Sequence, residues 1–411
     1  MNISVAIIGL GYVGLPLAIE FSKKYKTIGF DINDKRIREL NNKIDKTNEI
    51  SKEELKNTKA IFTSNICDIK NSNFYVITVP TPIDENKKPD LTLLIMASMF
   101  VADNLKKGDI VVYESTVAPG TTEDVCIPIL EKLSKLRACS DFKVGYSPER
   151  INPGDKVNTL KSIVKVVSAK DKKSLEIISG VYQNILDVPV YRASSIKVAE
   201  ASKMLENVQR DVNIALMNEF SLFLQKMDIN TNDVLNACYT KWNFSKYKPG
   251  LVGGHCVGVD PYYLIEKAND LDHNLPLIET ARKINSEMKE YILKKCKNFL
   301  LTKNLSFKEA EIAIFGLTFK EDCPDTRNSM AFEIAESIHC KKVYRIDPYV
   351  ILDKQEIGKS DIVIFAVTHK EFKQMTKEKV MSYLKPNSMI IDIGGMFNKW
   401  AFGKDIKYFC L

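Results

Sequence analysis

The sequence predicts an α/β protein with two Rossmann-like doubly wound domains joined by a long central helix. Apolar, β-rich runs alternate with amphipathic segments over residues 1–190, which implies a parallel sheet with helical crossovers. From Ser194 to Met227 a 3.6-residue period continues without an internal Gly or Pro, and strand-like runs return after about residue 305. The expected domains are a Rossmann-like domain, a central helical domain and a second Rossmann-like domain, over residues 1–193, 194–304 and 305–411.

The individual strands are predicted from short apolar runs bounded by turn residues, as in buried parallel strands. In the first domain these runs lie at residues 3–9, 27–32, 74–80, 109–115, 141–147 and 162–169. In the last domain they lie at residues 311–317, 341–347, 361–367 and 388–394. Two further helices are expected at about 231–239 and 275–302.

Composition excludes several classes of protein. The first residues lack the basic start of a signal peptide, and glycines interrupt the apolar run, so we expect a cytoplasmic protein without a membrane span. The nine cysteines contain no C-x-x-C pair and the four histidines no H-x-x-x-H spacing, which argues against a metal site or a disulfide framework. A net charge of +7 without a clustered basic stripe argues against nucleic acid and suits a small anionic ligand.

A glycine-rich turn near the N-terminus predicts a dinucleotide site. Gly9, Gly11 and Gly14 form G-x-G-x-x-G between an apolar strand and a helix, and Asp31 ends the next strand. In this context the glycines bring the backbone close to a pyrophosphate at a helix N-terminus, and the acid binds a ribose hydroxyl. The acid favours NAD over NADP. A generic glycine turn is the alternative, and the fold alone names no substrate.

Cys256, in GGHCVGVDP, poses a second question. It can be a nucleophile, a metal ligand, half of a disulfide or a small apolar filler, as Cys67, Cys126 and Cys296 are expected to be. Two preceding glycines let the backbone approach a ligand, and Asp260 can lie near it as a base or as a group that orients water. Spacing alone leaves the nucleophile and the filler both open.

A thiol together with NAD indicates a particular reaction. A dehydrogenase that stops at an aldehyde or ketone needs no nucleophile, whereas one that continues to a carboxylate does, because an aldehyde yields no hydride until something adds to its carbonyl. A thiolate gives a thiohemiacetal, whose oxidation gives a thioester that water hydrolyses. The combination predicts a four-electron oxidation.

At this point several motifs resemble one family across nearly the whole chain. The motifs are GLGYVGLP, VPTPID, YESTVAPGTT, GYSPERINPGD, the helix that begins SSIKVAEASKMLENVQ, GGHCVGVDPYYL and FGLTFKEDCPDTRNS. They resemble the UDP-glucose/UDP-mannose (nucleotide-sugar) 6-dehydrogenases. SPERINPGD, TKWNF and GGHCVGVDP are most similar to the branch that oxidises UDP-N-acetylglucosamine or UDP-N-acetylgalactosamine for capsule and O-antigen polysaccharides.

The resemblance implies a role for six residues. The catalytic thiol falls on Cys256 and the water-activating aspartate on Asp260. The lysine and asparagine that stabilise oxyanions fall on Lys203 and Asn207, which share one helix face as i and i+4 and would otherwise be read as a solvated pair.

Two residues of the first domain complete that set. Glu149 matches the acid–base residue of thioester hydrolysis and would otherwise be a loop carboxylate. Thr116 matches a threonine that holds the catalytic water and would otherwise cap a strand end.

The resemblance implies that residues 1–193 form an NAD-binding domain, residues 194–304 a dimerisation domain and residues 305–411 a UDP-sugar-binding domain. Ligand contacts are therefore expected on the first and the last domain. Lys320 and Arg327 follow a strand of the last domain and supply cations for a UDP group, although Arg327 can instead pair with Asp325. The expected cofactor-binding residues are Gly9, Gly11, Tyr12, Val13, Gly14, Asp31, Arg36, Thr81, Thr116, Lys320 and Arg327. The expected substrate-binding residues are Glu149, Arg150, Lys203, Asn207, Tyr247, Gly250, Gly253 and Lys320. The resemblance also implies an arginine contributed by the neighbouring subunit. That arginine has no clear match in this chain, and Lys241 is a candidate for its role.

The leading hypothesis is an NAD-dependent UDP-N-acetylhexosamine 6-dehydrogenase acting as a homodimer or higher homo-oligomer. Within the family the alternative is oxidation of UDP-glucose or UDP-N-acetylmannosamine. Outside it, one alternative is an NAD-sensing module without turnover, against which the intact site residues argue. Another is a two-electron hydroxyacid dehydrogenase, which would leave Cys256 dispensable.

Overall fold

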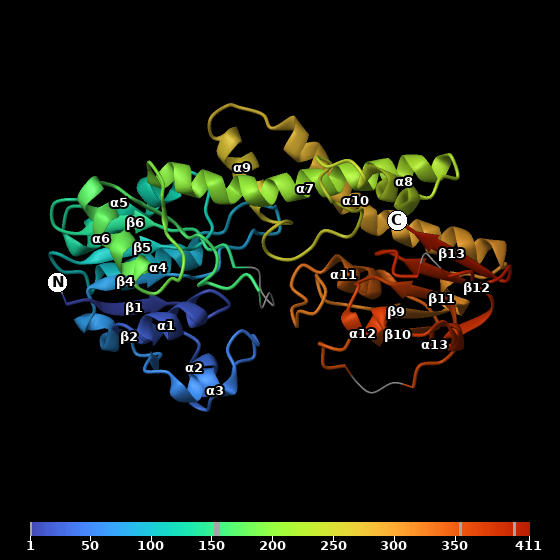
Figure 1. Ribbon diagram of the computed structural model, residues 1–411, viewed down its shortest axis with the longest axis horizontal. Coiled ribbons are helices and arrows are strands. Elements are labelled where there is room, and N and C mark those ends of the chain that lie inside the picture. The colour runs from blue at the N-terminus through green and yellow to red at the C-terminus, as the bar shows by residue number, and fades with distance from the viewer. Residues whose placement is uncertain (1, 152–156, 353–355, 398–399) are drawn as a thin grey trace. The chain divides into compact units, whose positions relative to one another are not determined.

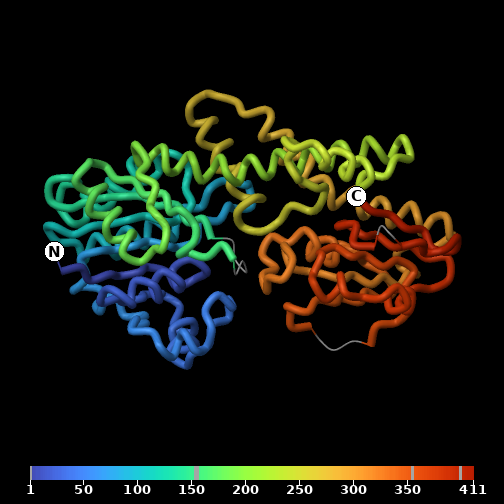
Figure 2. Tube along the Cα trace, in the orientation of Figure 1, coloured from blue at the N-terminus to red at the C-terminus, as the bar shows by residue number. Residues whose placement is uncertain are grey.

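The computed structural model describes residues 2–151, 157–352, 356–397 and 400–411. The chain forms two compact units. Unit 1 comprises Met1–Glu206 and Tyr262–His273, and unit 2 comprises Asn207–Pro261 and Asn274–Leu411. Figure 1 shows a sheet flanked by helices in each unit, and Figure 2 traces the chain through them. Helix α7 (Ile196–Lys226) passes from one unit into the other, as the uninterrupted helical period predicts.

Unit 1 is built on a sheet whose strands, in the described part of the chain, follow the order β3-β2-β1-β4-β5-β6-β7-β8. The strands are β1 (Ser4–Ile8), β2 (Lys26–Phe30), β3 (Ile61–Thr63), β4 (Phe74–Ile77), β5 (Ile110–Tyr113), β6 (Lys143–Tyr146), β7 (Val166–Ala169) and β8 (Tyr191–Arg192). The helices are α1 (Gly14–Ser22), α2 (Asp34–Asn41), α3 (Lys52–Asn57), α4 (Thr92–Ala102), α5 (Ile127–Ser134) and α6 (Lys172–Gln183), with short turns of other helix types at Ile66–Asn71 and Thr122–Cys126. The order reverses beside β1, which is where a doubly wound sheet opens its ligand crevice.

Both faces of this sheet are covered, which explains why its strands consist mostly of apolar residues. In β1, Val5 and Ile7 pack into one hydrophobic cluster, while Ala6 and Ile8 pack into the other. Successive side chains of a strand point to opposite faces, so each face has its own core.

Unit 2 contains the second sheet, in the order β10-β9-β11-β12-β13 and parallel throughout its described residues. Its strands are β9 (Glu311–Phe315), β10 (Lys342–Ile346), β11 (Ser360–Phe365), β12 (Leu384–Asp392) and β13 (Ile406–Cys410). Its helices are α8 (Thr231–Cys238), α10 (Pro276–Thr302), α11 (Met330–Ser337), α12 (Lys370–Lys373) and α13 (Lys377–Ser382), with a short turn at Phe307–Glu309. Helix α9 (Asp260–Asn269) begins in unit 2 and continues in unit 1.

The predicted fold class is confirmed, with two departures in detail. Strands β3, β8 and β13 were not predicted, because they are short or carry polar residues. Strand β7 pairs antiparallel with β6, whereas the sequence suggested a parallel sheet. The described residues between these two strands contain no crossover helix, and a parallel pair needs one.

Within the described ranges, no helix is both long and apolar enough to cross a membrane.

Candidate functional site

The turn from β1 to α1 has the geometry of a phosphate-binding turn. Gly9 has a φ of +94°, and its N–H donates to the carbonyl of Phe30 at 2.8 Å. A Cβ on Gly14 would lie 1.8 Å from the carbonyl oxygen of Gly9, so the helix packs on the strand only because residue 14 has no side chain. A Cβ on Gly11 would meet no atom within 4 Å, so that part of the backbone is open to a ligand.

Asp31 borders this turn. Its Oδ2 accepts the N–H of Leu10 at 2.8 Å, and its Oδ1 accepts the N–H of Asn33 at 2.9 Å. The side chain stays partly exposed. The carboxylate is thus fixed beside the glycine turn and remains partly accessible, and its contact with a ribose stays a prediction.

Other predicted cofactor residues lie around the same turn. Arg36 donates from Nε to the carbonyl of Leu10 at 2.9 Å, and its Nη1 lies 2.9 Å from Asp45 Oδ1. Thr81 donates to the carbonyl of Thr116 at 2.6 Å, after the carboxyl ends of β4 and β5. Tyr12 and Val13, inside the turn itself, are partly exposed. The structure therefore brings together the predicted cofactor residues of unit 1.

Glu149 sits in a buried charged cluster of unit 1. Its Oε1 accepts the N–H groups of Arg150 at 2.6 Å and Ile151 at 2.5 Å, and its Oε2 lies 3.5 Å from Lys165 Nζ. Lys165 also pairs with Glu114 at 2.7 Å. Burial raises the pKa of Glu114 to about 7, against the opposing effect of Lys165. The second half of the predicted motif, residues 152–156, lies outside the described residues.

Arg150, a predicted substrate residue, is engaged within unit 1. Its Nη2 lies 2.8 Å from Glu206 Oε1, and its Nη1 donates to the carbonyl of Val164 at 2.9 Å. These bonds engage the guanidinium within unit 1, and its contact with substrate stays a prediction.

In unit 2 the structure brings Cys256, Asp260 and Asn207 together. Cys256 is partly exposed in the turn that precedes α9, and its carbonyl accepts the N–H of Asp260 at 2.9 Å. Asn207 donates from Nδ2 to Asp260 Oδ2 at 2.5 Å, and both side chains are almost fully buried. An amide nitrogen carries two hydrogens, so this bond is compatible with a second bond to a developing oxyanion.

Lys203 lies one helical turn before Asn207 on α7, as the i, i+4 spacing predicts. It is only 8% exposed, so it is a buried lysine and not a solvated surface lysine. A lysine at a buried position of a helix face must meet an acceptor or an anion, since burying an unpaired charge is costly.

A pocket of about 600 Å³ lies at the carboxyl edge of the second sheet. Residues that follow β9, β11 and β12 form one side of it, and the segment before Cys256 forms another. Three of the predicted substrate residues line it, namely Gly250, Gly253 and Lys320. Tyr247 lies nearby in the chain, where its carbonyl accepts a hydrogen bond from Tyr239 at 3.0 Å.

Arg327 forms the internal ion pair that the sequence left open. Its Nη2 lies 2.6 Å from Asp325 Oδ2. Burial acts to raise the pKa of Asp325, but the hydrogen bonds from Arg327 outweigh it and hold that pKa below its ordinary value. The guanidinium is half exposed. Both Lys320 and Arg327 lie in unit 2, in the loop that follows β9, which favours a substrate role over a cofactor role.

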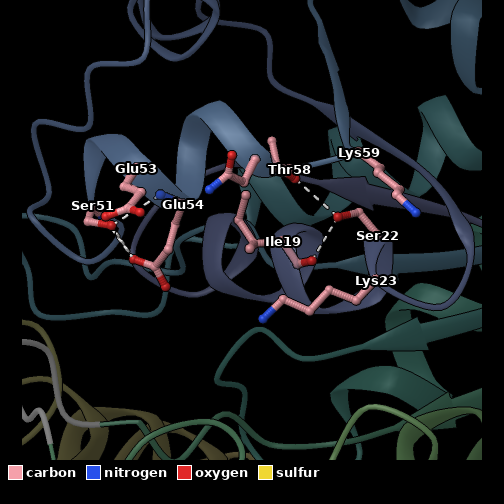
Figure 3. A pocket seen from close by; sticks show the side chains of 9 residues that line it. Ile19, Ser22, Lys23, Ser51, Glu53, Glu54, Thr58 and Lys59 are labelled. Atoms are coloured by element: carbon pink, nitrogen blue, oxygen red, sulfur yellow. Dashed lines mark hydrogen bonds between the residues drawn. The ribbon is translucent and has the colours of Figure 1, made fainter.

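A smaller hollow of about 400 Å³ lies in unit 1 between α1 and α3 (Figure 3). Its polar side chains bond to one another: Ser22 to Thr58 at 3.1 Å, and Ser51 to Glu54 in a capping box. Lys23 pairs with Glu20. The hollow carries no group that the site chemistry needs.

Four buried polar residues beside the thiol turn were not predicted from sequence. They are Asp211 and Asn218 on α7 and Arg282 and Asn285 on α10. One signal was available: Asn285 occupies a position in the apolar period of α10 defined by Ala281, Met288 and Ile292. Among the described residues, no group of three or more His, Cys, Asp or Glu is placed to hold a metal ion.

Comparison with known families matches three successive segments of the chain. Residues 2–186 match the NAD binding domain of the UDP-glucose/GDP-mannose dehydrogenase family, residues 197–287 its central domain and residues 313–399 its UDP binding domain. The predicted cofactor, NAD, is confirmed by the first match. The close packing at Gly14 and the open backbone at Gly11 fit a dinucleotide in that unit.

Individual relatives span nearly the full length. The chain is 48% identical to Protein CapL of Staphylococcus aureus over 97% of each chain. It is 45% identical to the UDP-N-acetyl-D-glucosamine 6-dehydrogenase of Pseudomonas aeruginosa, over 95% of this chain and 96% of that one. Among solved structures, UDP-D-ManNAc dehydrogenase from Pyrococcus horikoshii superimposes with a TM-score of 0.91 at 32% identity, covering 99% of both chains.

Proposed function

Because the chain belongs to the UDP-glucose/GDP-mannose dehydrogenase family, we propose that it oxidises C6 of a UDP-N-acetylhexosamine to the uronic acid. The sugar is N-acetylglucosamine or N-acetylgalactosamine, and the product serves surface polysaccharide synthesis. The observation that carries the proposal is the buried Asn207–Asp260 bond at the turn that holds Cys256. This arrangement of amide, carboxylate and thiol suits a reaction that passes through an acyl intermediate.

The thiol divides the oxidation into two stages. When bound, NAD accepts a hydride from C6 in each stage. Between them the Cys256 thiolate adds to the C6 aldehyde and forms a thiohemiacetal. Loss of the second hydride leaves a thioester on Cys256, and one water molecule then releases the carboxylate and regenerates the thiol.

Neighbouring side chains handle charge and protons in these stages. Lys203 and Asn207 stabilise the negative charge that develops on the C6 oxygen. Asp260 takes a proton from the attacking water, in an orientation fixed by Asn207. Glu149 serves as acid–base residue in thioester hydrolysis, and Thr116 holds the water.

The UDP group occupies the pocket at the carboxyl edge of the second sheet. The match to a UDP binding domain covers the strands that form this edge. Lys320 supplies a cation, and Gly250 and Gly253 line the same pocket without side chains that would fill it.

The relatives favour N-acetylglucosamine over N-acetylmannosamine as the sugar. The two relatives named UDP-N-acetyl-D-glucosamine 6-dehydrogenase are 45% and 46% identical to this chain. One named UDP-N-acetyl-D-mannosamine dehydrogenase is 34% identical. UDP-N-acetylmannosamine is therefore the second candidate, supported by the similarity to the Pyrococcus structure.

A homodimer is the proposed assembly. Within unit 2, helix α7 presents exposed apolar side chains at successive turns, Leu216, Phe220 and Phe223, and exposed Met227 follows its last residue. A contiguous apolar face of this kind is typical of a contact with a second copy. Sedimentation velocity tests it, and a monomer at micromolar concentration contradicts it.

The cytoplasm is the proposed compartment, because the thiol of Cys256 must stay reduced to act as a nucleophile.

The activity is tested by incubating the purified protein with NAD and a panel of UDP-sugars. UDP-N-acetylglucosamine, UDP-N-acetylgalactosamine, UDP-N-acetylmannosamine and UDP-glucose are compared by kcat/KM, and mass spectrometry identifies the products. The expected result is a uronic acid from one of the first two sugars. Release of an aldehyde or ketone as the end product, or turnover of none of the four, contradicts the proposal.

A further inference from the structure

The turn that carries Cys256 is held by polar side chains that no step of the proposed chemistry uses. Arg282, on α10, binds Asp211 of α7 through two nitrogens: Nε donates to Oδ2 at 2.8 Å, and Nη2 lies 2.7 Å from Oδ1. Its third nitrogen, Nη1, donates to the carbonyl of Gly258 at 3.1 Å. Gly258 lies midway between Cys256 and Asp260 in the chain.

These bonds connect α7 to the turn a second time. Asp211 follows Asn207 by one helical turn, and Asn207 holds Asp260. The helix therefore contacts the turn directly at Asp260 and, through Arg282, at Gly258. Two fixed points on either side of residue 259 define where the start of α9 lies relative to α7.

The same buried network also reaches the chain before Cys256. Asn285 donates from Nδ2 to Asp211 Oδ1 at 2.7 Å, and its own Oδ1 accepts from Asn218 at 2.8 Å. Asn218 pairs with both backbone groups of Gly250, at 3.0 Å and 2.8 Å. One continuous set of hydrogen bonds thus fixes residues 250 and 258.

The chemistry of the network points to positioning. Arg282 is 6% exposed, and Asp211, Asn218 and Asn285 are fully buried. Burial raises the pKa of Asp211, an effect that Arg282 and Asn285 only partly offset. A buried ion pair adds little net stability compared with apolar side chains of similar size. What a planar guanidinium supplies is direction, because it binds a carboxylate and a carbonyl at set angles.

We propose that Arg282 is a positioning residue: by joining Asp211 to the Gly258 carbonyl, it sets the geometry of Cys256 and Asp260 relative to Asn207. This inference rests on the proposed function for its effect on turnover.

The test compares Arg282→Lys with Lys303→Gln in the full-length protein. A lysine keeps the charge but presents a single point of donation, so it binds Asp211 or Gly258 but not both. Lys303→Gln removes a different ion pair of unit 2, Lys303 to Asp361 at 2.9 Å, which does not reach the turn. Asp211→Asn, which keeps the shape of the side chain, decides the matter if Arg282→Lys does not fold.

The expected result is a kcat lower by about 10²-fold in Arg282→Lys, as for a reacting group displaced by about 1 Å. KM values for NAD and UDP-sugar stay unchanged, and Lys303→Gln keeps wild-type kcat. A folded Arg282→Lys or Asp211→Asn with wild-type kcat overturns the inference. So does a loss that appears equally in Lys303→Gln.

A second measurement separates this inference from the proposed function. The rate of Cys256 alkylation by iodoacetamide, followed across pH by peptide mass spectrometry, needs no turnover. We expect Arg282→Lys to react several-fold faster than wild type because the turn loosens, and Lys303→Gln to react at the wild-type rate. An unchanged rate in Arg282→Lys contradicts the positioning role, even if no UDP-sugar is oxidised.

Discussion

In each unit, the first strand of the sheet ends at a glycine with positive φ that bonds to the end of the neighbouring strand. Gly9 donates to Phe30 and Gly316 to Ile346, both at 2.8 Å. In each unit the carboxylate after that neighbouring strand then accepts the N–H of the residue that follows the glycine. Asp31 accepts from Leu10 at 2.8 Å, and Asp347 accepts from Leu317 at 2.6 Å.

We call this arrangement of a glycine and a carboxylate at the ends of two neighbouring strands the junction of each unit. The two junctions differ in the exposure of the carboxylate. Asp31 remains partly exposed beside a turn that enters α1 within five residues. The Asp347 side chain is fully buried, and His369 Nε2 lies 3.3 Å from its Oδ2. After Gly316 the chain forms a loop that includes Lys320, and α11 begins only at Met330. The corresponding carboxylate therefore stays accessible beside the glycine turn in unit 1. In unit 2 it is buried against His369, which also bonds to the loop that carries Lys320.

The largest effect is expected from adding a side chain where the strand and the helix of the unit 1 junction pack together. Gly14→Ala would place a Cβ 1.8 Å from the Gly9 carbonyl oxygen, so strand and helix must separate. We expect a loss of about 3 kcal/mol in the free energy of unfolding and about 10²-fold weaker NAD binding. Denaturant unfolding and calorimetric titration with NAD measure the two effects.

Gly11→Ala is the matched control for that prediction. Its Cβ would meet no protein atom within 4 Å, so unfolding should be unchanged while NAD binds more weakly. Equal stability of the two variants would show that Gly14 is not required for packing.

The next largest effect is expected from replacing the histidine that contacts Asp347 in the unit 2 junction. His369 is fully buried, and its Nδ1 accepts the N–H of Asp322 at 2.9 Å. His369→Phe keeps a ring but leaves buried Asp347 without this donor, which should cost about 1–3 kcal/mol. We expect a higher KM for the UDP-sugar, because the loop with Lys320 loosens, and an unchanged KM for NAD. His339→Phe, at an exposed histidine of the same unit, should change neither value.

This variant should also change acid stability. Burial acts to raise the pKa of Asp347, but hydrogen bonds from His369 and from backbone N–H groups hold it below the ordinary 3.8. The depressed pKa contributes stability above pH 3.8 that is lost as the pH falls through the folded-state pKa. With His369→Phe that loss should shrink. Unfolding curves measured between pH 2 and 5 would then show a weaker dependence of stability on pH.

The smallest effect concerns cofactor choice. Asp31→Ser removes a charge that repels a 2′-phosphate and also removes the acceptor of Leu10 N–H. The ratio of kcat/KM for NAD to that for NADP should fall roughly 10-fold. Asp34→Ser, an exposed acid in the first turn of α2, is the control and should leave the ratio unchanged. A wild type that uses NADP as efficiently as NAD would refute the assignment of Asp31.

The unit 1 junction could be predicted from sequence because all its signals are local. Gly9, Gly11, Gly14 and Asp31 lie within 23 residues and form one recognisable motif. The unit 2 junction keeps only the first glycine, and neither Asp347 nor His369 carries a local signal. The ligand site of unit 2 was predicted instead from Lys320 and Arg327, two cationic residues that follow the predicted strand at 311–317.

The thiol site shows a different limit. Cys256 and Asp260 are close in sequence, but Asn207 lies 53 residues from Asp260, and only family resemblance connected them. Asp211 and Arg282 read in sequence as ordinary charged residues on amphipathic helices. Their burial follows from the packing of α7 against α10, which no local pattern encodes. The catalytic roles of Lys203, Glu149 and Thr116 stay predictions.

The central claim is that Cys256 carries an acyl intermediate, and counting NADH per sugar in wild type and Cys256→Ser tests it most directly. A serine hydroxyl is far less ionised than a thiol near neutral pH, and an oxygen ester lacks the reactivity of a thioester. Wild type should release two NADH for each UDP-sugar consumed, whereas Cys256→Ser should bind both ligands and fail to complete the oxidation. Full turnover of Cys256→Ser with two NADH per sugar would contradict the account.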